Sequence, residues 1–234
     1  MVRRTPTAFL WPWRATSAPA STHPRRSTAR AGRLDLAVQG VSDGAVTQGE
    51  AREDGTRVWQ YAYHELLTAN LERLSQWEPW AGEPTAVDGT RMFLEARGRA
   101  WLEGNELPVA IAVRAENGWR LVGSAGLQID RYSQSADAGY WIDGEFEGRG
   151  LVTRTMEVLL DQAFGPLGLA RVSVQTEAGN QRSHAVAVRL GFTEEGLHRQ
   201  AMAFRDQRRD LVVYGLLADE WRSRRPDSRQ DQPI

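Results

Sequence analysis

The chain has 234 residues, 41% of them hydrophobic, and a formal net charge of −1. These values predict one domain with a substantial core and flanking tails. There is no cysteine, which excludes a disulfide framework, thiolate metal ligands and a cysteine nucleophile. The four histidines (His23, His64, His184 and His198) lack metal-ligand spacing, so no metal site is expected. No apolar run reaches the roughly 20 residues of a membrane span, so no membrane partner is expected.

Arginine supplies all 29 basic residues, because the sequence contains no lysine. This excludes a Schiff-base lysine and the lysine of a P-loop. Residues 1–33 hold seven arginines and no acid, and residues 222–234 hold four arginines and two aspartates, which leaves an excess of acid between them. An acidic body argues against a nucleic-acid partner and suits a basic or amine-bearing substrate.

Residues 1–53 are rich in small residues, proline and arginine, without periodicity. This composition predicts a disordered basic extension, or a start codon placed too far upstream. A targeting peptide is disfavoured because the apolar segment Phe9–Trp13 is short and contains a proline. A short strand is allowed at Leu34–Val38.

Two helices are expected next. Apolar residues at helical spacing predict an amphipathic helix over Tyr63–Trp77, which Pro79 ends. A second helix is predicted over Val87–Glu103, with Gly104 as its stop.

Strands dominate the following segment, and a hairpin signal at residues 116–118 separates the first two. The predicted elements are strands Pro108–Arg114, Arg120–Ile129 and Ala136–Ile142, helix Gly150–Phe164, strand Ala170–Gln175, helix Asn180–Leu190, and a hairpin of His198–Phe204 with Asp210–Leu217. A disordered tail is predicted for residues 222–234. The order predicts an α+β domain over residues 54–221, with a single mixed, mostly antiparallel sheet flanked by helices.

A glycine loop joins the strand that ends at Ile142 to the helix that opens at Gly150. Gly148 and Gly150 flank Arg149 at the helix start. A helix N-terminus has unpaired N–H groups and a partial positive charge, and glycine lets a ligand approach the backbone closely. The loop therefore predicts a site for a phosphate-bearing cofactor.

Other phosphate motifs fit less well. A P-loop needs a lysine, and a dinucleotide fingerprint needs a third glycine where Thr153 stands and an acid on the strand over residues 170–175. A glycine turn that only packs helix against strand remains an alternative.

A second motif, GNQRSHAVAVRLGF, runs from Gly179 to Phe192. Together with the glycine loop it resembles the GNAT superfamily of acyl-CoA-dependent N-acyltransferases, over roughly residues 58–221. Four segments and Thr153 after the glycine loop resemble the RimJ/RimL type, which acetylates the N-terminal amine of ribosomal proteins. The segments are NLERLSQWEPW, GYWID, NQRS followed by LGF, and RRDLVVYGLLADEW. The resemblance implies the GNAT fold.

The resemblance implies acetyl-CoA as the acyl donor, with its pyrophosphate on the loop and its pantetheine arm along the preceding strand. Two positions depart from the family pattern: Glu147 stands for Gln or Arg, and Val152 for Gly or Ala. We expect Glu147 to face solvent, because a carboxylate repels pyrophosphate. The implied donor-binding residues are Tyr140, Trp141, Ile142, Gly148, Arg149, Gly150, Leu151, Val152, Thr153, Asn180 and Ser183.

Direct attack of an amine on a thioester needs a base for the amine and an acid for the thiolate, but no covalent nucleophile. By resemblance Ser183 is the general acid, although a helix-start serine bonded to backbone is the alternative. Asn180 is expected to cap that helix. Relatives place a glutamate where Met202 stands here, so Asp210 is the substitute base, with bracing of the hairpin as the equal alternative. Glu195 is expected to be structural.

The resemblance implies a cytoplasmic enzyme, monomeric or homodimeric, whose acceptor is a protein N-terminus. A small amine such as an antibiotic is an alternative acceptor, and a non-catalytic CoA-binding module is an alternative function. Trp77 and Trp80 are candidates for the acceptor entrance, with core packing as the alternative. His64 and His198 are expected to be packing or surface residues.

Overall fold

The computed structural model describes residues 55–82, 86–115 and 118–225. The predicted basic extension, its Leu34–Val38 strand and the tail after residue 225 lie outside the described residues. Within the described ranges, no helix is long and apolar enough to cross a membrane.

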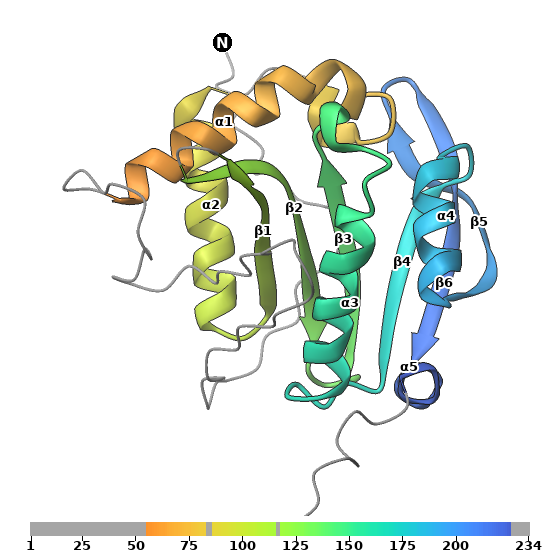
Figure 1. Cartoon of the computed structure of the whole chain (residues 1–234). Helices are drawn as coiled ribbons and strands as arrows, with labels where there is room; N and C mark the ends of the chain where they lie inside the picture. Colours follow the sequence, from red (N-terminus) through yellow and green to blue (C-terminus); the bar gives the residue numbers. More distant parts are fainter. Residues whose placement is uncertain (1–54, 83–85, 116–117, 226–234) are drawn as a thin grey trace, which may run out of the picture.

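Six strands form one mixed sheet in the order β1-β2-β3-β4-β6-β5 (Figure 1). All neighbours are antiparallel except β3 and β4, which run parallel. The strands are β1 (Glu106–Ala115), β2 (Gly118–Asp130), β3 (Ser135–Ile142), β4 (Arg171–Glu177), β5 (Thr193–Phe204) and β6 (Gln207–Leu217). This confirms the predicted single, mostly antiparallel sheet.

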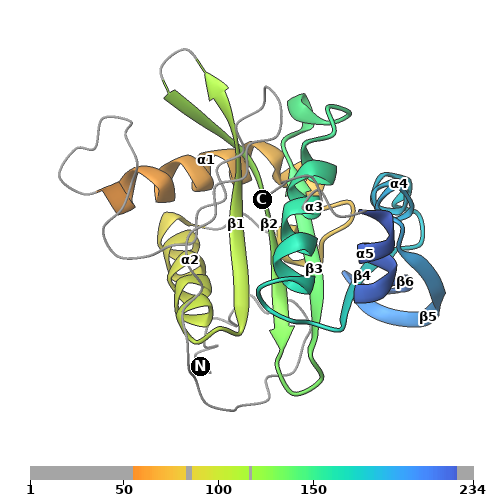
Figure 2. The ribbon, with the colours of Figure 1, turned by 60° about the horizontal axis from the view of Figure 1, so that its bottom comes forward.

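Helices cover both faces of the sheet (Figure 2). One face carries α1 (Gly55–Leu74), the 3-10 turn η1 (Pro79–Gly82) and α2 (Val87–Leu102). The other face carries α3 (Leu151–Phe164), α4 (Gln181–Leu190) and the short α5 (Ala218–Arg224). Each face therefore has its own core.

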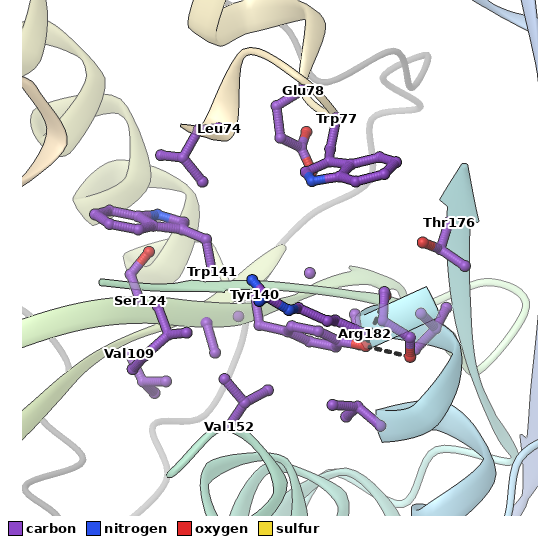
Figure 3. A pocket seen from close by; sticks show the side chains of 18 of the residues that line it. Leu74, Trp77, Glu78, Val109, Ser124, Tyr140, Trp141, Val152, Thr176 and Arg182 are labelled. Carbon is purple, nitrogen blue, oxygen red and sulfur yellow. Dashed lines mark hydrogen bonds between the residues drawn. The ribbon is translucent and has the colours of Figure 1, made fainter. Parts of the chain in front are cut away.

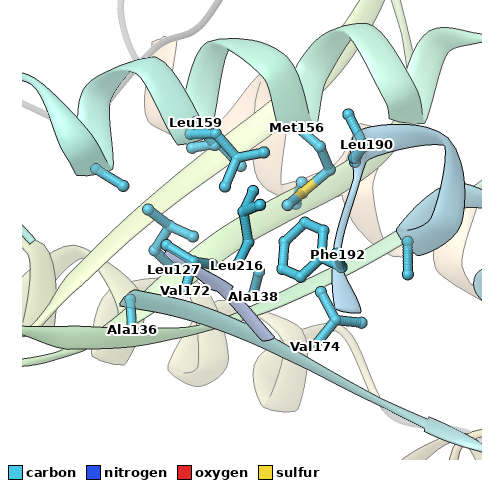
Figure 4. Packing of buried hydrophobic residues seen from close by; sticks show 14 of the residues in the cluster. Leu127, Ala136, Ala138, Met156, Leu159, Val172, Val174, Leu190, Phe192 and Leu216 are labelled. Carbon is cyan, nitrogen blue, oxygen red and sulfur yellow. The ribbon is translucent and has the colours of Figure 1, made fainter. Parts of the chain in front are cut away.

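Alternation along the strands divides the apolar residues between the two cores. On β2, Leu121 joins the core under α1 and α2, and its neighbour Val122 joins the core under α3. Met156 and Leu159 of α3 are fully buried against the sheet, beside Phe192 (Figure 4). Helix α3 and the glycine loop before it are thus fixed on the sheet by a packed apolar face.

The parallel pair β3–β4 is bonded only over Ser135–Asp137 and Arg171–Ser173, and the strands then separate. The Asp143 N–H donates to the Val122 carbonyl at 2.6 Å, so the backbone N–H of Asp143 points toward β2. The backbone N–H and C=O groups of successive strand residues point in opposite directions. The backbone groups of Tyr140 and Ile142 therefore point away from β2, into the opening between β3 and β4. The sheet therefore presents unpaired strand edge between β3 and β4.

Several predicted boundaries were wrong. Helix α1 begins at Gly55 and ends at Leu74, not at Trp77, and β5 begins at Thr193. Residues 222–224, predicted as tail, belong to α5. Trp221 anchors this helix, because its side chain is buried and its indole N–H donates to Asp161 at 2.9 Å.

Candidate active site

The glycine loop adopts the conformation that its sequence predicts. Gly148 and Gly150 both have φ of +70°, in the left-handed region that favours glycine, and Gly150 is the N-cap of α3. The first bond inside the helix runs from the Arg154 N–H to the Gly150 carbonyl at 3.1 Å. The N–H groups of residues 151–153 therefore have no partner within the helix and are available to an anion.

Arginines surround this helix start, and sequence reasoning singled out only Arg149. The Arg149 guanidinium lies 4.6 Å from the centre of the Phe146 ring. Arg154 donates to the Arg149 carbonyl at 2.8 Å, and Arg189 donates to the Thr153 hydroxyl at 3.2 Å. Together with the helix dipole they make the site favourable for phosphate.

Glu147 does not face solvent as predicted. Its side chain is only 19% exposed and forms ion pairs with Arg73 of α1, at 2.7 Å, and with Arg182 of α4. Two cations flank one carboxylate, so the loop keeps a net positive environment despite the acidic residue. The sequence could not show this pairing, because Arg73 lies 74 positions away.

The same arginine fastens the loop to α1. Arg73 also donates to the Ile142 carbonyl and to the Asn70 side chain. Asn70 is buried, and its side-chain oxygen accepts the Gly144 N–H at 3.1 Å. Helix α1 therefore positions both the end of β3 and the loop.

Ser183 lies on α4 with its hydroxyl 3.0 Å from the Tyr140 hydroxyl of β3. The Asn180 side chain accepts the Ser183 N–H at 3.2 Å, which confirms the predicted cap. Burial raises the pKa of Tyr140 to about 12, against the opposing effect of the Ser183 hydrogen bond. The phenol therefore stays protonated at neutral pH, and either oxygen can donate in its hydrogen bond with the Ser183 hydroxyl.

A cleft of about 1390 Å³ extends from the glycine loop, past the opening between β3 and β4, to the helices α1 and α2 (Figure 3). Trp77 and Trp80 line it, both half-buried. Met202 of β5 also lines the cleft and is buried. Ligand pockets typically measure about 300–1,000 Å³, so this cleft has room for a donor and an acceptor together.

Glu78 also lines the cleft, and sequence reasoning did not single it out. Burial raises the pKa of its carboxyl above the ordinary value, and a hydrogen bond from the Trp80 indole at 2.9 Å partly offsets this. In Figure 3 its side chain extends into the cleft above β3, which carries Tyr140 and Trp141. A carboxylate that holds its proton more tightly suits proton transfer near neutral pH.

Asp210 lies on β6 and is not among the residues that line the cleft. Its carboxylate accepts the Gln200 N–H at 2.6 Å. Gln200 has a φ of +52° and lies in an irregularity of β5, between His198 and Met202. This contact supports the hairpin-bracing role that the sequence left open.

The remaining candidates have structural surroundings. Glu195 forms a two-point ion pair with Arg171, which holds the pKa of its carboxyl below the ordinary value. The His64 ring bonds to Thr90 between α1 and α2, at 2.9 Å. His198 is exposed on β5. In the described part of the chain, no group of three or more His, Asp or Glu side chains could hold a metal ion.

The chain matches the family described as acetyltransferase (GNAT) domain over residues 57–193. This match spans more than half of the chain, and the chain therefore belongs to the GNAT family. It is an N-acetyltransferase whose acyl donor is acetyl-CoA, and the free N–H groups, the arginines and the open strand edge fit that donor.

Three comparisons show what the chain is similar to, one with a protein sequence and two with solved structures. The chain is 34% identical to the putative ribosomal N-acetyltransferase YdaF of Bacillus subtilis over 159 residues, which cover 67% of this chain and 85% of that protein. The structure of Mycobacterium smegmatis RimJ in complex with CoA-disulfide matches with a TM-score of 0.62 and 26% identity, covering 69% of this chain and 78% of that one. RimL, a ribosomal L7/L12 alpha-N-protein acetyltransferase in complex with coenzyme A, matches with a TM-score of 0.66 and 23% identity, over 81% and 97% of the two chains.

Proposed function

We propose that this enzyme acetylates the N-terminal amine of a protein in the cytoplasm. The similarity to a protein named as a putative ribosomal N-acetyltransferase supports this acceptor class. The observation that carries it is the size of the cleft, about 1390 Å³, which leaves room for the end of a polypeptide beside the donor.

The donor would lie with its pyrophosphate on the free N–H groups of residues 151–153. The left-handed glycines Gly148 and Gly150 let the backbone turn toward it. Its pantetheine arm would pair with the backbone of residues 140–142, as an added strand in the opening between β3 and β4. Asn180 and Ser183 then lie at the far side of that opening, on α4.

The transfer moves two protons. From the neutral amine, the nitrogen loses one as the new C–N bond forms, and the sulfur gains one as the C–S bond breaks. An amine that enters as ammonium first loses one further proton, which leaves to solvent. Ser183 supplies the second proton, and the Tyr140 hydroxyl, which is protonated at neutral pH, stabilises the resulting serine oxygen by its hydrogen bond. Asp210 is the proton acceptor that the sequence suggests for the amine, and Glu78 is the alternative that the cleft offers.

The test measures coenzyme A release by a thiol reagent. Because the chain has no cysteine, the protein gives no background signal. Short peptides with a free N-terminal alanine or serine should release thiol, and the N-acetylated peptides should not. We expect Ser183→Ala to lower kcat by about 100-fold while acetyl-CoA still binds. Release with small amines but with none of the peptides would replace the protein acceptor by a small-molecule one. Binding of acetyl-CoA without release for any amine would leave a non-catalytic module.

A further inference from the structure

We propose that Glu78 forms the acceptor-amine site, where its carboxylate binds the incoming ammonium group and then takes its proton. The site would select a primary amine with one positive charge on an uncharged, apolar carrier. This inference rests on the proposed acetyl transfer, and it assigns a role to a residue outside the donor-binding motifs.

The backbone fixes Glu78 between α1 and η1. Its N–H donates to the Leu74 carbonyl at 2.8 Å, and its own carbonyl accepts the Ala81 N–H at 3.1 Å. The turn is also held by the sheet, because Arg209 of β6 donates to the Gln76 carbonyl at 2.8 Å. The Glu78 side chain is thus carried by a braced segment, not by a free loop.

The direction of the side chain suits an amine that approaches the opening in the sheet. In Figure 3 the Glu78 side chain extends from the α1–η1 connection into the cleft above β3, which carries Tyr140 and Trp141. Tyr140 marks the place where the strand edge is open and where the Ser183 hydroxyl lies. An amine bound by Glu78 would therefore enter the cleft from the side opposite to α4.

In the part of the cleft next to α1 and α2, the Glu78 carboxylate is available to bind a cation. One of its oxygens accepts the Trp80 indole N–H at 2.9 Å, and within the described ranges no arginine forms an ion pair with it. By contrast, Glu106 of β1 is paired with Arg97 of α2. A half-buried carboxylate without a cation is an unfavourable arrangement that a ligand ammonium group would relieve.

The other charged groups around Glu78 are committed elsewhere. Arg73 of α1 and Arg182 of α4 share Glu147. Glu177 at the end of β4 accepts the Gly179 N–H at 3.0 Å, and Arg209 of β6 lies over the Phe204 ring. Burial is therefore the main influence on Glu78, and the raised pKa of its carboxyl matches the role of a base that works near neutral pH.

The aromatic residues around Glu78 determine which group the acceptor amine can be attached to. Tyr63 stacks on Phe93 with ring centres 6.2 Å apart and meets Trp141 edge-on at 5.9 Å, and all three rings line the cleft. Trp77 and Trp80 add two indoles beside the carboxylate. Aromatic faces attract one ammonium group and its apolar substituent. A polyamine would need several unpaired carboxylates, and the Arg97 and Arg73 ion pairs occupy two of those nearby.

The experiment compares Glu78→Gln with the unaltered protein, using an N-terminal alanine peptide and spermidine as probe amines. We expect Glu78→Gln to bind acetyl-CoA normally by calorimetry and to lose about 100-fold in kcat/KM for the peptide. The rise of kcat/KM with pH, which reports ionisation of the base, should disappear in the variant. Spermidine should be a poor acceptor. Glu72→Gln is the matched control, because Glu72 is an exposed acid six residues earlier in the chain and does not line the cleft.

Two results would overturn the assignment. One is an unchanged pH profile in Glu78→Gln together with a profile that flattens in Asp210→Asn, because the base would then be Asp210. The other comes from infrared difference spectra between the unaltered protein and Glu78→Gln, which follow protonation of this one carboxyl without any turnover. A carboxyl that titrates at the ordinary value and does not respond to the peptide amine rules out the site, even if no acetyl transfer is found. A raised pKa that falls when the peptide amine binds supports the site in that case too.

Discussion

The two ends of the cleft are built in different ways. The donor end consists of consecutive backbone, because the loop, the start of α3 and the open edge of β3 follow one another within residues 139–153. The acceptor end consists of side chains from elements far apart in the chain, including Glu78 after α1, Trp141 on β3 and Met202 on β5. A ligand held by backbone tolerates many side chains, whereas a ligand held by converging side chains depends on each of them.

The two ends of the cleft also differ in how their acidic side chains are neutralised. At the donor end Glu147 is neutralised by two arginines, Arg73 and Arg182. At the acceptor end Glu78 is half-buried, and within the described ranges no arginine forms an ion pair with it. The first arrangement stabilises the fold, and the second leaves a charge that a substrate has to satisfy. The predictions below test this contrast, beginning with the largest expected effect.

Blocking the backbone at the donor end should abolish donor binding. Gly148→Glu places a bulky anion in the loop, and we expect acetyl-CoA affinity to fall at least about 100-fold, or about 2.8 kcal/mol, by calorimetry. Gly168→Glu is the matched control. Both glycines have left-handed φ, +70° and +62°, and an added Cβ at either meets no atom within 4 Å.

The two variants therefore carry the same backbone strain, on the order of 1–2 kcal/mol, but only Gly148 lines the cleft. Both should lose similar stability in thermal unfolding. Equal losses of acetyl-CoA affinity would show that strain, and not the position in the loop, controls donor binding.

Glu147 should act on stability more than on binding. Glu147→Gln removes two ion pairs from a side chain that is 19% exposed, and we expect a loss of about 1–2 kcal/mol, because Arg182 is largely exposed and contributes little. Acetyl-CoA affinity should be retained, since the freed arginines remain beside the site.

The control is Glu145→Gln, an exposed acid of the same loop that pairs with Arg120. Its unfolding temperature should stay near that of the unaltered protein. A large loss of donor affinity in Glu147→Gln, with stability unchanged, would contradict the bracing role and make Glu147 part of donor recognition.

The same contrast explains what the sequence could predict. The loop, Gly148, Gly150 and the Asn180 cap are local signals, so their conformations could be predicted from neighbouring residues. The partners of Glu147 could not, because Arg73 and Arg182 come from two other helices.

Longer contacts explain the other errors as well. Helix α5 is short and lies in an arginine-rich segment, and it depends on the bond from Trp221 to Asp161, 60 positions earlier. Glu78 has no distinguishing local pattern, because proline after it marks a helix end and nothing in the turn indicates burial. Its surroundings arise only when α1, β3 and the β5–β6 hairpin close around one cleft.

The smallest predicted effect is on the stability of Glu78→Gln, which should rise at neutral pH, whereas that of Glu147→Gln should fall. The pKa of Glu78 is raised in the folded protein, so the folded state binds this proton more tightly than the unfolded state does. The contribution of Glu78 to stability is therefore fully present below the ordinary carboxyl pKa and is lost as pH rises through the raised value. Glu78→Gln removes this loss. Its unfolding temperature should match that of the unaltered protein near about pH 4 and exceed it at neutral pH. Glu147→Gln should be less stable at neutral pH. If both substitutions lower stability there, Glu78 has a stabilising cation in the folded protein and the two ends of the cleft are electrostatically alike.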